Sequence, residues 1–264
     1  MALSALLTVM INAARKAARG VQRDFGEIAN LQVSLKGPAN FVTNADRRCE
    51  KVLREELDKA RPGYGFLMEE GGAIRGSDPD HRWIVDPIDG TTNFIHAIPL
   101  LAISLALERK GEIVAAVTYN PITDELFTAE KGRGAFLNNH RLRVAQRRDI
   151  HEAVIACGIP HRGQGDQARF RRELALIQAK ASGIRRLGSA TLELAFVAAG
   201  RFDAFWERGL SAWDLAAGML MIREAGGFTA DCDGDASPLE TGAIVACNAD
   251  LLPQIKADLR SARE

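Results

Sequence analysis

The strongest constraint on the fold is the stretch Trp83–Phe94, WIVDPIDGTTNF, in which an apolar, β-branched run ends in two aspartates. Carboxylates at the end of a buried strand cost free energy unless a cation or hydrogen bonds compensate them. Pro87 fixes its own φ angle and lacks an N–H, so it makes a rigid corner between Asp86 and Asp89. The two carboxylates and the Ile88 carbonyl can then converge on one point, which favours a hard divalent cation such as Mg²⁺.

The next residues, Gly90–Asn93, have the composition of a helix start. The free N–H groups of a helix N-terminus favour an anion such as phosphate. The stretch therefore predicts a divalent cation and a phosphate side by side. From these residues alone the alternative is a β-turn with an aspartate as helix N-cap, because D-P-x-D-G is a common turn composition.

Two other acidic positions could join the same site. Glu69 and Glu70 end the short apolar segment GFLMEE, where a glutamate could complete a metal site or simply face solvent. Asp214 stands in the first turn of the helix expected from SAWDLAAG. An acid in that position is commonly just a partner of the helix dipole, so its metal-binding role needs independent support.

The composition is that of a soluble globular protein and gives no global sign of a nucleic-acid or membrane partner. The 264 residues suit one large domain or two tightly joined ones, and 34 basic residues balance 34 acidic ones. The arginine-rich stretch His140–His151 is interpreted as a solvated face. Four scattered cysteines without a C-x-x-C pair indicate reduced thiols and a cytoplasmic location.

The apolar N-terminal segment Met1–Gly20 is expected to form an amphipathic helix. Its apolar residues recur at helical spacing, Ser4, Thr8 and Asn12 interrupt the run, and no basic segment precedes it. A signal peptide is therefore not predicted. No run approaches the roughly 20 apolar residues that a membrane span needs.

Helix signals recur along the chain. Residues 3–25 and Asn44–Gly63 are expected to be helical, the second with Asn44 as its N-cap. The segment between them contains a loop at Gly37-Pro38. A later helix, ARFRRELALIQAKASG, is expected to end at Gly183.

The order of elements predicts an α/β protein of alternating layers. Apolar segments between residues 100 and 145 are closely spaced and separated by turn residues, which predicts antiparallel hairpins. After residue 152 strands alternate with helices. We expect an N-terminal part, residues 1–150, with the antiparallel sheet and most of the acids, and a C-terminal part, residues 151–264, with Asp214.

Two long motifs give the chain a recognisable pattern. WIVDPIDGTTNF and WDLAAGMLMIREAGG match, in order and spacing, the two signatures of the inositol monophosphatase family, which the chain resembles. The segments KGPANFVTNAD, GFLMEE and LGSATLELAFVAAGRFDAFWE match three further motifs, so the resemblance runs from about Lys36 to Cys247. It implies an αβαβα sandwich shared with fructose-1,6-bisphosphatase, a homodimer, and Mg²⁺-dependent, lithium-sensitive hydrolysis of small phosphate monoesters.

The resemblance also implies roles for individual residues. Two to three Mg²⁺ ions per subunit would be held by Glu69, Asp86, the Ile88 carbonyl, Asp89 and Asp214. Glu69, Thr91 and Asp46 would be catalytic, with Thr91 and Asp46 relaying a proton from the attacking water. Gly90 and Thr91 would bind the phosphate through backbone N–H groups. The hydroxyl-bearing part of the substrate would contact Gly188, Ser189, Ala190 and Glu207.

The chain departs from the family pattern at two positions. Asn40 stands where the family usually has aspartate, so a third, weakly held metal would bind less well because the charge is lost. Ala97 stands where the family has glycine, which adds strain if the backbone there has a positive φ. Neither change removes a principal metal ligand.

Three readings of function remain open. The leading one is a phosphatase acting on inositol monophosphate or a similar phosphorylated polyol or sugar. The same chemistry would serve fructose-1,6-bisphosphate, histidinol phosphate or 3′-phosphoadenosine 5′-phosphate. A different class is a protein with weak or no catalysis that acts with RNA and the transcription machinery, although the neutral charge and the lack of an aromatic, basic surface argue against nucleic acid as the main partner.

Overall fold

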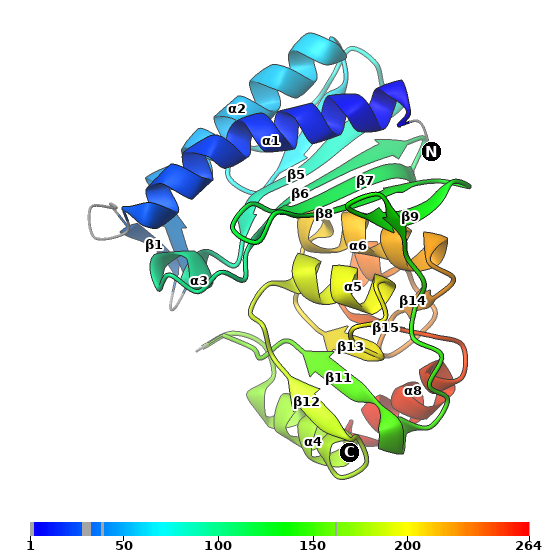
Figure 1. The fold of residues 1–264 in the computed structure, drawn as a ribbon. Helices are drawn as coiled ribbons and strands as arrows, with labels where there is room; N and C mark the ends of the chain where they lie inside the picture. Colours follow the sequence, from blue (N-terminus) through cyan, green and yellow to red (C-terminus); the bar gives the residue numbers. More distant parts are fainter. Residues whose placement is uncertain (1–2, 28–32, 38–39, 162, 264) are drawn as a thin grey trace.

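The computed structural model describes residues 3–27, 33–37, 40–161 and 163–263, which form five alternating layers of helices and sheets (Figure 1). The first, third and fifth layers are helix pairs, and an eight-stranded and a five-stranded sheet lie between them. In order, the pairs are α1 (Ala5–Gly26) with α2 (Asn44–Ala60), α5 (Ala190–Ala198) with α6 (Ala212–Glu224), and α4 (Gln167–Gln178) with α8 (Leu251–Ser261). The predicted α/β fold of alternating layers is confirmed.

The larger sheet is mostly antiparallel, and β5 to β10 pair in chain order as the hairpin prediction requires. Only β3 and β5 run parallel in it. Across the sheet the strands are β10 (His140–Arg141), β9 (Gly134–Leu137), β8 (Glu125–Glu130), β7 (Glu112–Asn120), β6 (Ala102–Arg109), β5 (His81–Asp89), β3 (Gly65–Met68) and β4 (Gly72–Ile74).

The smaller sheet is mixed, since β11 pairs in parallel with both of its neighbours while the other pairs are antiparallel. Its strands lie in the order β12 (Gly183–Arg185), β11 (Val154–Cys157), β13 (Ala204–Glu207), β15 (Ile244–Cys247) and β14 (Phe228–Ala230). The mixed order follows from helices α4 and α5, which connect β11, β12 and β13.

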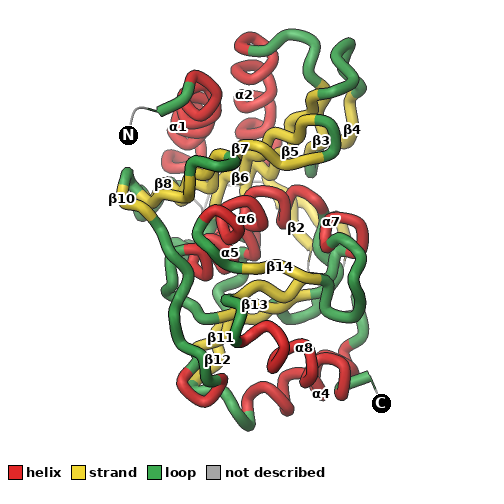
Figure 2. Tube along the Cα trace, turned by 90° about the vertical axis from the view of Figure 1, so that its right-hand side faces the viewer, coloured by secondary structure: helices red, strands yellow, loops and turns green. Residues whose placement is uncertain are grey.

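Apolar side chains fill each of the spaces between layers. α1 buries one face, including Met10, Ala14 and Val21, against the larger sheet, which confirms the predicted amphipathic helix. α6 is apolar around most of its surface because it lies between the two sheets, as Figure 2 shows for α5 and α6. Among the described helices none is long and apolar enough to cross a bilayer.

Two local predictions were wrong, and one hairpin was not predicted. Thr43, not Asn44, is the N-cap of α2, because its hydroxyl accepts from the Ala45 and Asp46 N–H groups. The loop predicted at Gly37-Pro38 extends into residues outside the described ranges, and the strands on either side of it, β1 (Val33–Gly37) and β2 (Asn40–Thr43), which the sequence did not predict, pair as a hairpin. α4 ends at Gln178, and Gly183 begins β12 instead of ending the helix.

Candidate active site

A cavity of about 300 Å³ opens where the two sheets and the central helices meet. Its wall is formed by the ends of β3, β5, β11 and β13 and by the starts of α3 (Thr91–Ile95), α5 and α6. Every predicted site residue except Asp46 lines it, namely Glu69, Asp86, Ile88, Asp89, Gly90, Thr91, Gly188, Ser189, Ala190, Glu207 and Asp214. Positions far apart in the sequence are thus brought to one place.

The acid cluster, Asp86, Asp89 and Asp214, lies on one side of this cavity. One carboxylate oxygen from each lies within 4.8 Å of the other two. The pairing of β5 with β6 shifts between Asp86 and Asp89, so Pro87 and Ile88 form the corner expected from the sequence. Asp214 joins from the first turn of α6.

Hydrogen bonds hold one oxygen of each carboxylate in place. Oδ2 of Asp89 accepts from the hydroxyls of Ser189 and Thr191 and from the Thr191 N–H, each at 2.7 Å. Oδ2 of Asp214 accepts from the Ser211 N–H at 2.7 Å, so Asp214 is both a helix cap and a cluster member. Oδ1 of Asp86 accepts from the Ile88 N–H at 3.0 Å.

The electrostatics of the acid cluster fit a bound cation. Burial raises the pKa of Asp86 well above its usual range, and the nearby Glu69, Asp89 and Asp214 raise it further. Burial and Asp89 raise the pKa of Asp214 to about 8. Buried acids that repel one another are stable in the charged form only if a cation joins them. The donor set is all oxygen, which matches a hard divalent ion.

Glu69 approaches the cluster from the neighbouring strand. It follows β3 directly, and its N–H donates to the Val85 carbonyl at 3.1 Å, one residue before Asp86. Its charge contributes to the raised pKa of Asp86, so it lies close enough to share a cation with it.

The phosphate side begins at Gly90, the N-cap of the five-residue α3. Gly90 has φ = 91°, and a Cβ there would lie 2.9 Å from the Leu100 carbonyl oxygen. Only glycine fits both the conformation and the space. Gly90, Thr91 and Thr92 line the cavity beside the acid cluster.

Thr91 links the cavity to Asp46. Its hydroxyl lies 3.1 Å from both Oδ1 of Asp46 and the Ile88 carbonyl oxygen. The other Asp46 oxygen accepts from the N–H and the hydroxyl of Thr43 at 2.8 and 2.5 Å. Burial raises the pKa of Asp46, although these hydrogen bonds oppose the rise. Asp46 is fully buried, so it reaches the cavity only through Thr91.

The predicted substrate residues Gly188, Ser189, Ala190 and Glu207 line the same cavity as the acids. Ser189 caps α5 and uses its hydroxyl on Asp89, so its side chain supports the acid cluster as well as lining the cavity. Glu207 ends β13, and burial, followed by Glu193, raises its pKa well above the usual range. A Cβ on Gly158 would lie 1.7 Å from Cδ of Glu207, so only glycine at 158 leaves room for that carboxylate.

Comparison with known proteins identifies the family. The sequence model described as "Inositol monophosphatase family" matches residues 2–264. This chain belongs to the inositol monophosphatase family. The resemblance read from the motifs is thus confirmed, and with it the predicted enzyme class, a phosphoric monoester hydrolase.

Individual relatives are similar over nearly their whole length. The chain is 62% identical to an inositol-1-monophosphatase of Mesorhizobium japonicum, over 94% of this chain and 93% of the relative. It is 40% identical to the Nus factor SuhB of Escherichia coli, over 97% and 96% of the two chains. The crystal structure of the extragenic suppressor protein suhB of Bartonella henselae superposes with a TM-score of 0.95 at 54% identity, covering 97% of this chain and 99% of that one.

Sequence reasoning missed several residues in and around the cavity. Thr191 supports the acid cluster by giving Asp89 two hydrogen bonds, and Arg186 and Glu193 line the cavity. Burial is the main cause that raises the pKa of Glu193 to about 8, and its Oε1 accepts from the Leu187 N–H at 2.7 Å. A lone acid within the apolar helix SATLELAF was the available signal for Glu193.

Ala97 and Asn40 are the two positions at which the chain departs from the family pattern. Ala97 has φ = 56°, so the condition under which alanine adds strain is met. The backbone of Asn40 pairs with Gly37 in the β1–β2 hairpin, and its side chain lies outside the described part of the chain. The proposed weakening of a third metal site therefore stays a prediction.

Proposed function

We propose that this protein hydrolyses the phosphate monoester of an inositol monophosphate or a similar polyol phosphate, with Mg²⁺ as its cofactor. The observation that carries the proposal is the acid cluster, whose raised pKa values call for a cation beside the glycine-started α3. A relative that is 62% identical is named inositol-1-monophosphatase, which supports the substrate class.

Asp86, Asp89, Asp214, Glu69 and the Ile88 carbonyl would hold two to three Mg²⁺ ions. When bound, Mg²⁺ would neutralise phosphoryl oxygens and make a water molecule more acidic. The hydrogen bonds from Ser189, Thr191 and Ser211 keep the carboxylates directed before any ion arrives, and this lowers the cost of assembling the site.

Gly90 and Thr91 would orient the phosphate through their backbone N–H groups. The Thr91 hydroxyl donates to Asp46 and can therefore accept a proton from water in the cavity. Asp46 would receive the proton, because burial raises its pKa and the neutral form is stabilised. Glu69 would position the water from the opposite side.

On the substrate side Glu207 would accept hydrogen bonds from hydroxyl groups, while Gly188, Ser189 and Ala190 form the adjoining wall. A cavity of about 300 Å³ is at the lower end of the usual range for small-molecule sites, which suits a single phosphorylated ring. Lithium sensitivity, a homodimer and a cytoplasmic location belong to the same proposal; all four cysteines are free and buried, as reduced thiols require.

Phosphate release from a small panel tests this proposal. The panel is inositol 1-phosphate, fructose-1,6-bisphosphate, histidinol phosphate and 3′-phosphoadenosine 5′-phosphate, each with and without Mg²⁺. We expect Mg²⁺-dependent turnover that is fastest with inositol 1-phosphate. Absence of turnover with every member, from correctly folded protein, would contradict the proposal; recovery of activity on Asn40→Asp would then show that position 40 had cost the chain its catalysis.

A second candidate function is a role with RNA and the transcription machinery. Relatives that are 40% identical are named Nus factor SuhB, which favours it. Arg147 and Arg148 of the arginine-rich stretch face acids, with Arg147 2.8 Å from Asp203 and Arg148 3.6 Å from Asp250, which weakens the stretch as an RNA-binding surface. A gel shift with ribosomal RNA at low salt tests it, and loss of binding on Arg141→Ala and Arg143→Ala would support it.

A further inference from the structure

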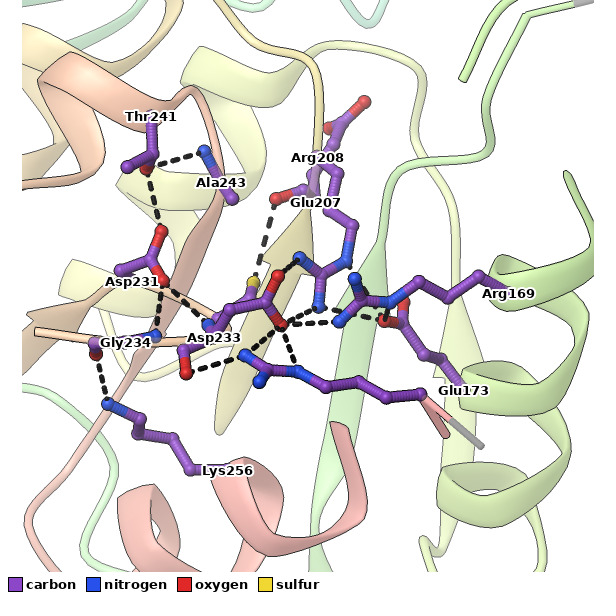
Figure 3. Close-up of polar contacts among 12 residues, drawn as sticks. Arg169, Glu173, Glu207, Arg208, Asp231, Asp233, Gly234, Thr241, Ala243 and Lys256 are labelled. Carbon is purple, nitrogen blue, oxygen red and sulfur yellow. Dashed lines mark hydrogen bonds and ion pairs between the residues drawn. The ribbon is translucent and has the colours of Figure 1, made fainter. Parts of the chain in front are cut away.

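A second polar cluster extends from Arg208, which lines the cavity (Figure 3). We call it the arginine cluster; it consists of Arg169 and Glu173 of α4, Arg208 after β13, Asp233 after β14 and Arg263 after α8. Its members come from separate parts of the chain. Arg208 directly follows Glu207 and also lines the cavity.

Arg208 is held by the carboxylates of two residues, Asp233 and Glu173. Its Nη1 and Nη2 donate to the two carboxylate oxygens of Asp233 at 2.8 and 2.9 Å. Its Nε donates to Oε1 of Glu173 at 2.9 Å, and Glu173 is only 1% exposed. A two-point contact of this kind sets the direction of a guanidinium group, whereas a lysine would act as a point charge.

The partners of Arg208 are fixed as well. The Asp233 and Gly234 N–H groups donate to Oδ1 of Asp231 at 2.7 and 2.6 Å, and the Thr241 hydroxyl donates to Oδ2 at 2.7 Å. Lys256 of α8 donates to the Gly234 carbonyl at 2.9 Å. The loop that carries Asp233 is therefore attached both to the segment before β15 and to α8, and it is a rigid support for Arg208.

The Glu207 carboxylate, in contrast, accepts no hydrogen bond from any residue within the described ranges. It occupies the space over Gly158, and its backbone pairs with Ile244 at the last position of β13. The position of the carboxylate thus depends on the backbone, and the chain leaves the sheet at Arg208. Figure 3 shows the two side chains on neighbouring positions, with only Arg208 directed into the cluster.

We propose that Arg208 is a positioning residue that, through the arginine cluster, holds Glu207 where it can bind the hydroxyl groups of the substrate. This inference rests on the proposed function, because it assigns to Glu207 the recognition of a polyol. Arg208 therefore affects how tightly the enzyme binds the hydroxyl groups of the substrate, and it does not affect the hydrolysis of the phosphate ester.

The test compares a substrate with hydroxyl groups and one whose leaving group has none. For Arg208→Met we expect the KM for inositol 1-phosphate to rise roughly ten-fold, while kcat/KM for p-nitrophenyl phosphate changes less than about two-fold. Arg208→Lys keeps the charge but loses the two-point contact, so we expect a smaller rise in the same direction. If Arg208→Met does not fold, Arg208→Lys alone still tests the inference.

Two further variants separate positioning from stability. Arg263→Gln removes an outer contact to Asp233 and is expected to lower the Tm without changing the ratio of the two substrates. In a double-mutant cycle with Glu207→Ala, Arg208→Met should add nothing to the KM if it acts through Glu207. An unchanged substrate ratio in the Arg208 variants, or additive effects in the cycle, would overturn the inference. Wild-type protein inactive on both substrates would instead refute the proposed function itself, and this inference with it.

Discussion

The acid cluster and the arginine cluster lie at the two ends of one short segment, from Arg208 to Asp214. They differ in how their carboxylates are stabilised. In the arginine cluster, three arginines surround Asp233, and their hydrogen bonds outweigh burial and hold its pKa below the usual range. In the acid cluster, burial and neighbouring acids raise the pKa of Asp86 and Asp214. In the arginine cluster each carboxylate pairs with arginines of this chain, whereas the carboxylates of the acid cluster need a cation from outside.

The largest expected difference in activity is between Asp89→Asn, in the acid cluster, and Asp233→Asn, in the arginine cluster. The first should lower kcat/KM by about 10³-fold, because a bound metal supplies several kcal/mol of transition-state stabilisation. The second should leave kcat intact and lower the free energy of unfolding by about 1–3 kcal/mol. Steady-state kinetics and urea unfolding check both, and the comparison fails if Asp233→Asn is the more damaging to kcat.

The proposed proton path gives the next largest effect. Thr91→Ala removes the hydroxyl that lies 3.1 Å from Asp46 and should lower kcat by about 10²-fold. Thr91→Ser keeps the hydroxyl and should stay within a few-fold of wild type. Equal losses in the two variants would show that the methyl group, and not the hydroxyl, is what matters.

The two clusters should also respond to pH with opposite signs in metal-free protein. Because the folded pKa of Asp214 is raised to about 8, its contribution to stability is complete below the unfolded pKa and is lost as pH rises toward 8. Because the folded pKa of Asp233 is lowered, its contribution is present above the unfolded pKa and is lost as pH falls through the folded value.

Unfolding free energies measured from pH 3 to pH 9 check these signs. Asp214→Asn should flatten the decline in unfolding free energy as pH rises from about 4 to 8, and Asp233→Asn should flatten the onset of its decline as pH falls below about 4. Mg²⁺ should raise the Tm of wild type more at pH 8 than at pH 5. A Mg²⁺ effect that shrinks as pH rises would contradict the assignment of the raised carboxylates to metal binding.

The smallest expected effect lies outside both clusters, at Ala97. Its φ of 56° is costly for a residue with a Cβ, so Ala97→Gly should raise the free energy of unfolding by about 1 kcal/mol. Chemical denaturation measures it, with kcat expected to be unchanged. A destabilised variant would mean that the lost chain entropy of glycine exceeds the relieved strain.

The sequence revealed those parts of the site that lie in contiguous motifs. Asp86, Asp89 and Gly90 could be placed because Pro87 and the glycine restrict the local backbone, and Asp214 because it starts a helix in a recognisable motif. The β1–β2 hairpin was missed because Gly37-Pro38 has the composition of a loop whether or not strands flank it. Thr43 was passed over as N-cap because the adjacent Asn44 is an equally good capping type.

The arginine cluster could not be predicted from the spacing of residues in the sequence. Arg208 meets Glu173 and Asp233 only because β13, β14 and α4 are brought together by the sheet order, and ion pairs between distant segments leave no periodic signal. Thr191 was missed for a related reason, since it lies in α5 while its partner Asp89 ends β5, about a hundred residues earlier in the chain. Local motifs reveal the chemistry of this site, whereas the residues that hold its parts in position depend on tertiary structure.

The most direct test of this account is calorimetric titration of Mg²⁺ into metal-free wild type, Asp214→Asn and Asp233→Asn at pH 8. We predict that wild type and Asp233→Asn bind Mg²⁺ alike and that Asp214→Asn loses a site, because only the acid cluster requires an external cation. Undiminished binding by Asp214→Asn, or no binding by wild type, would contradict the claim that these acids form a metal centre.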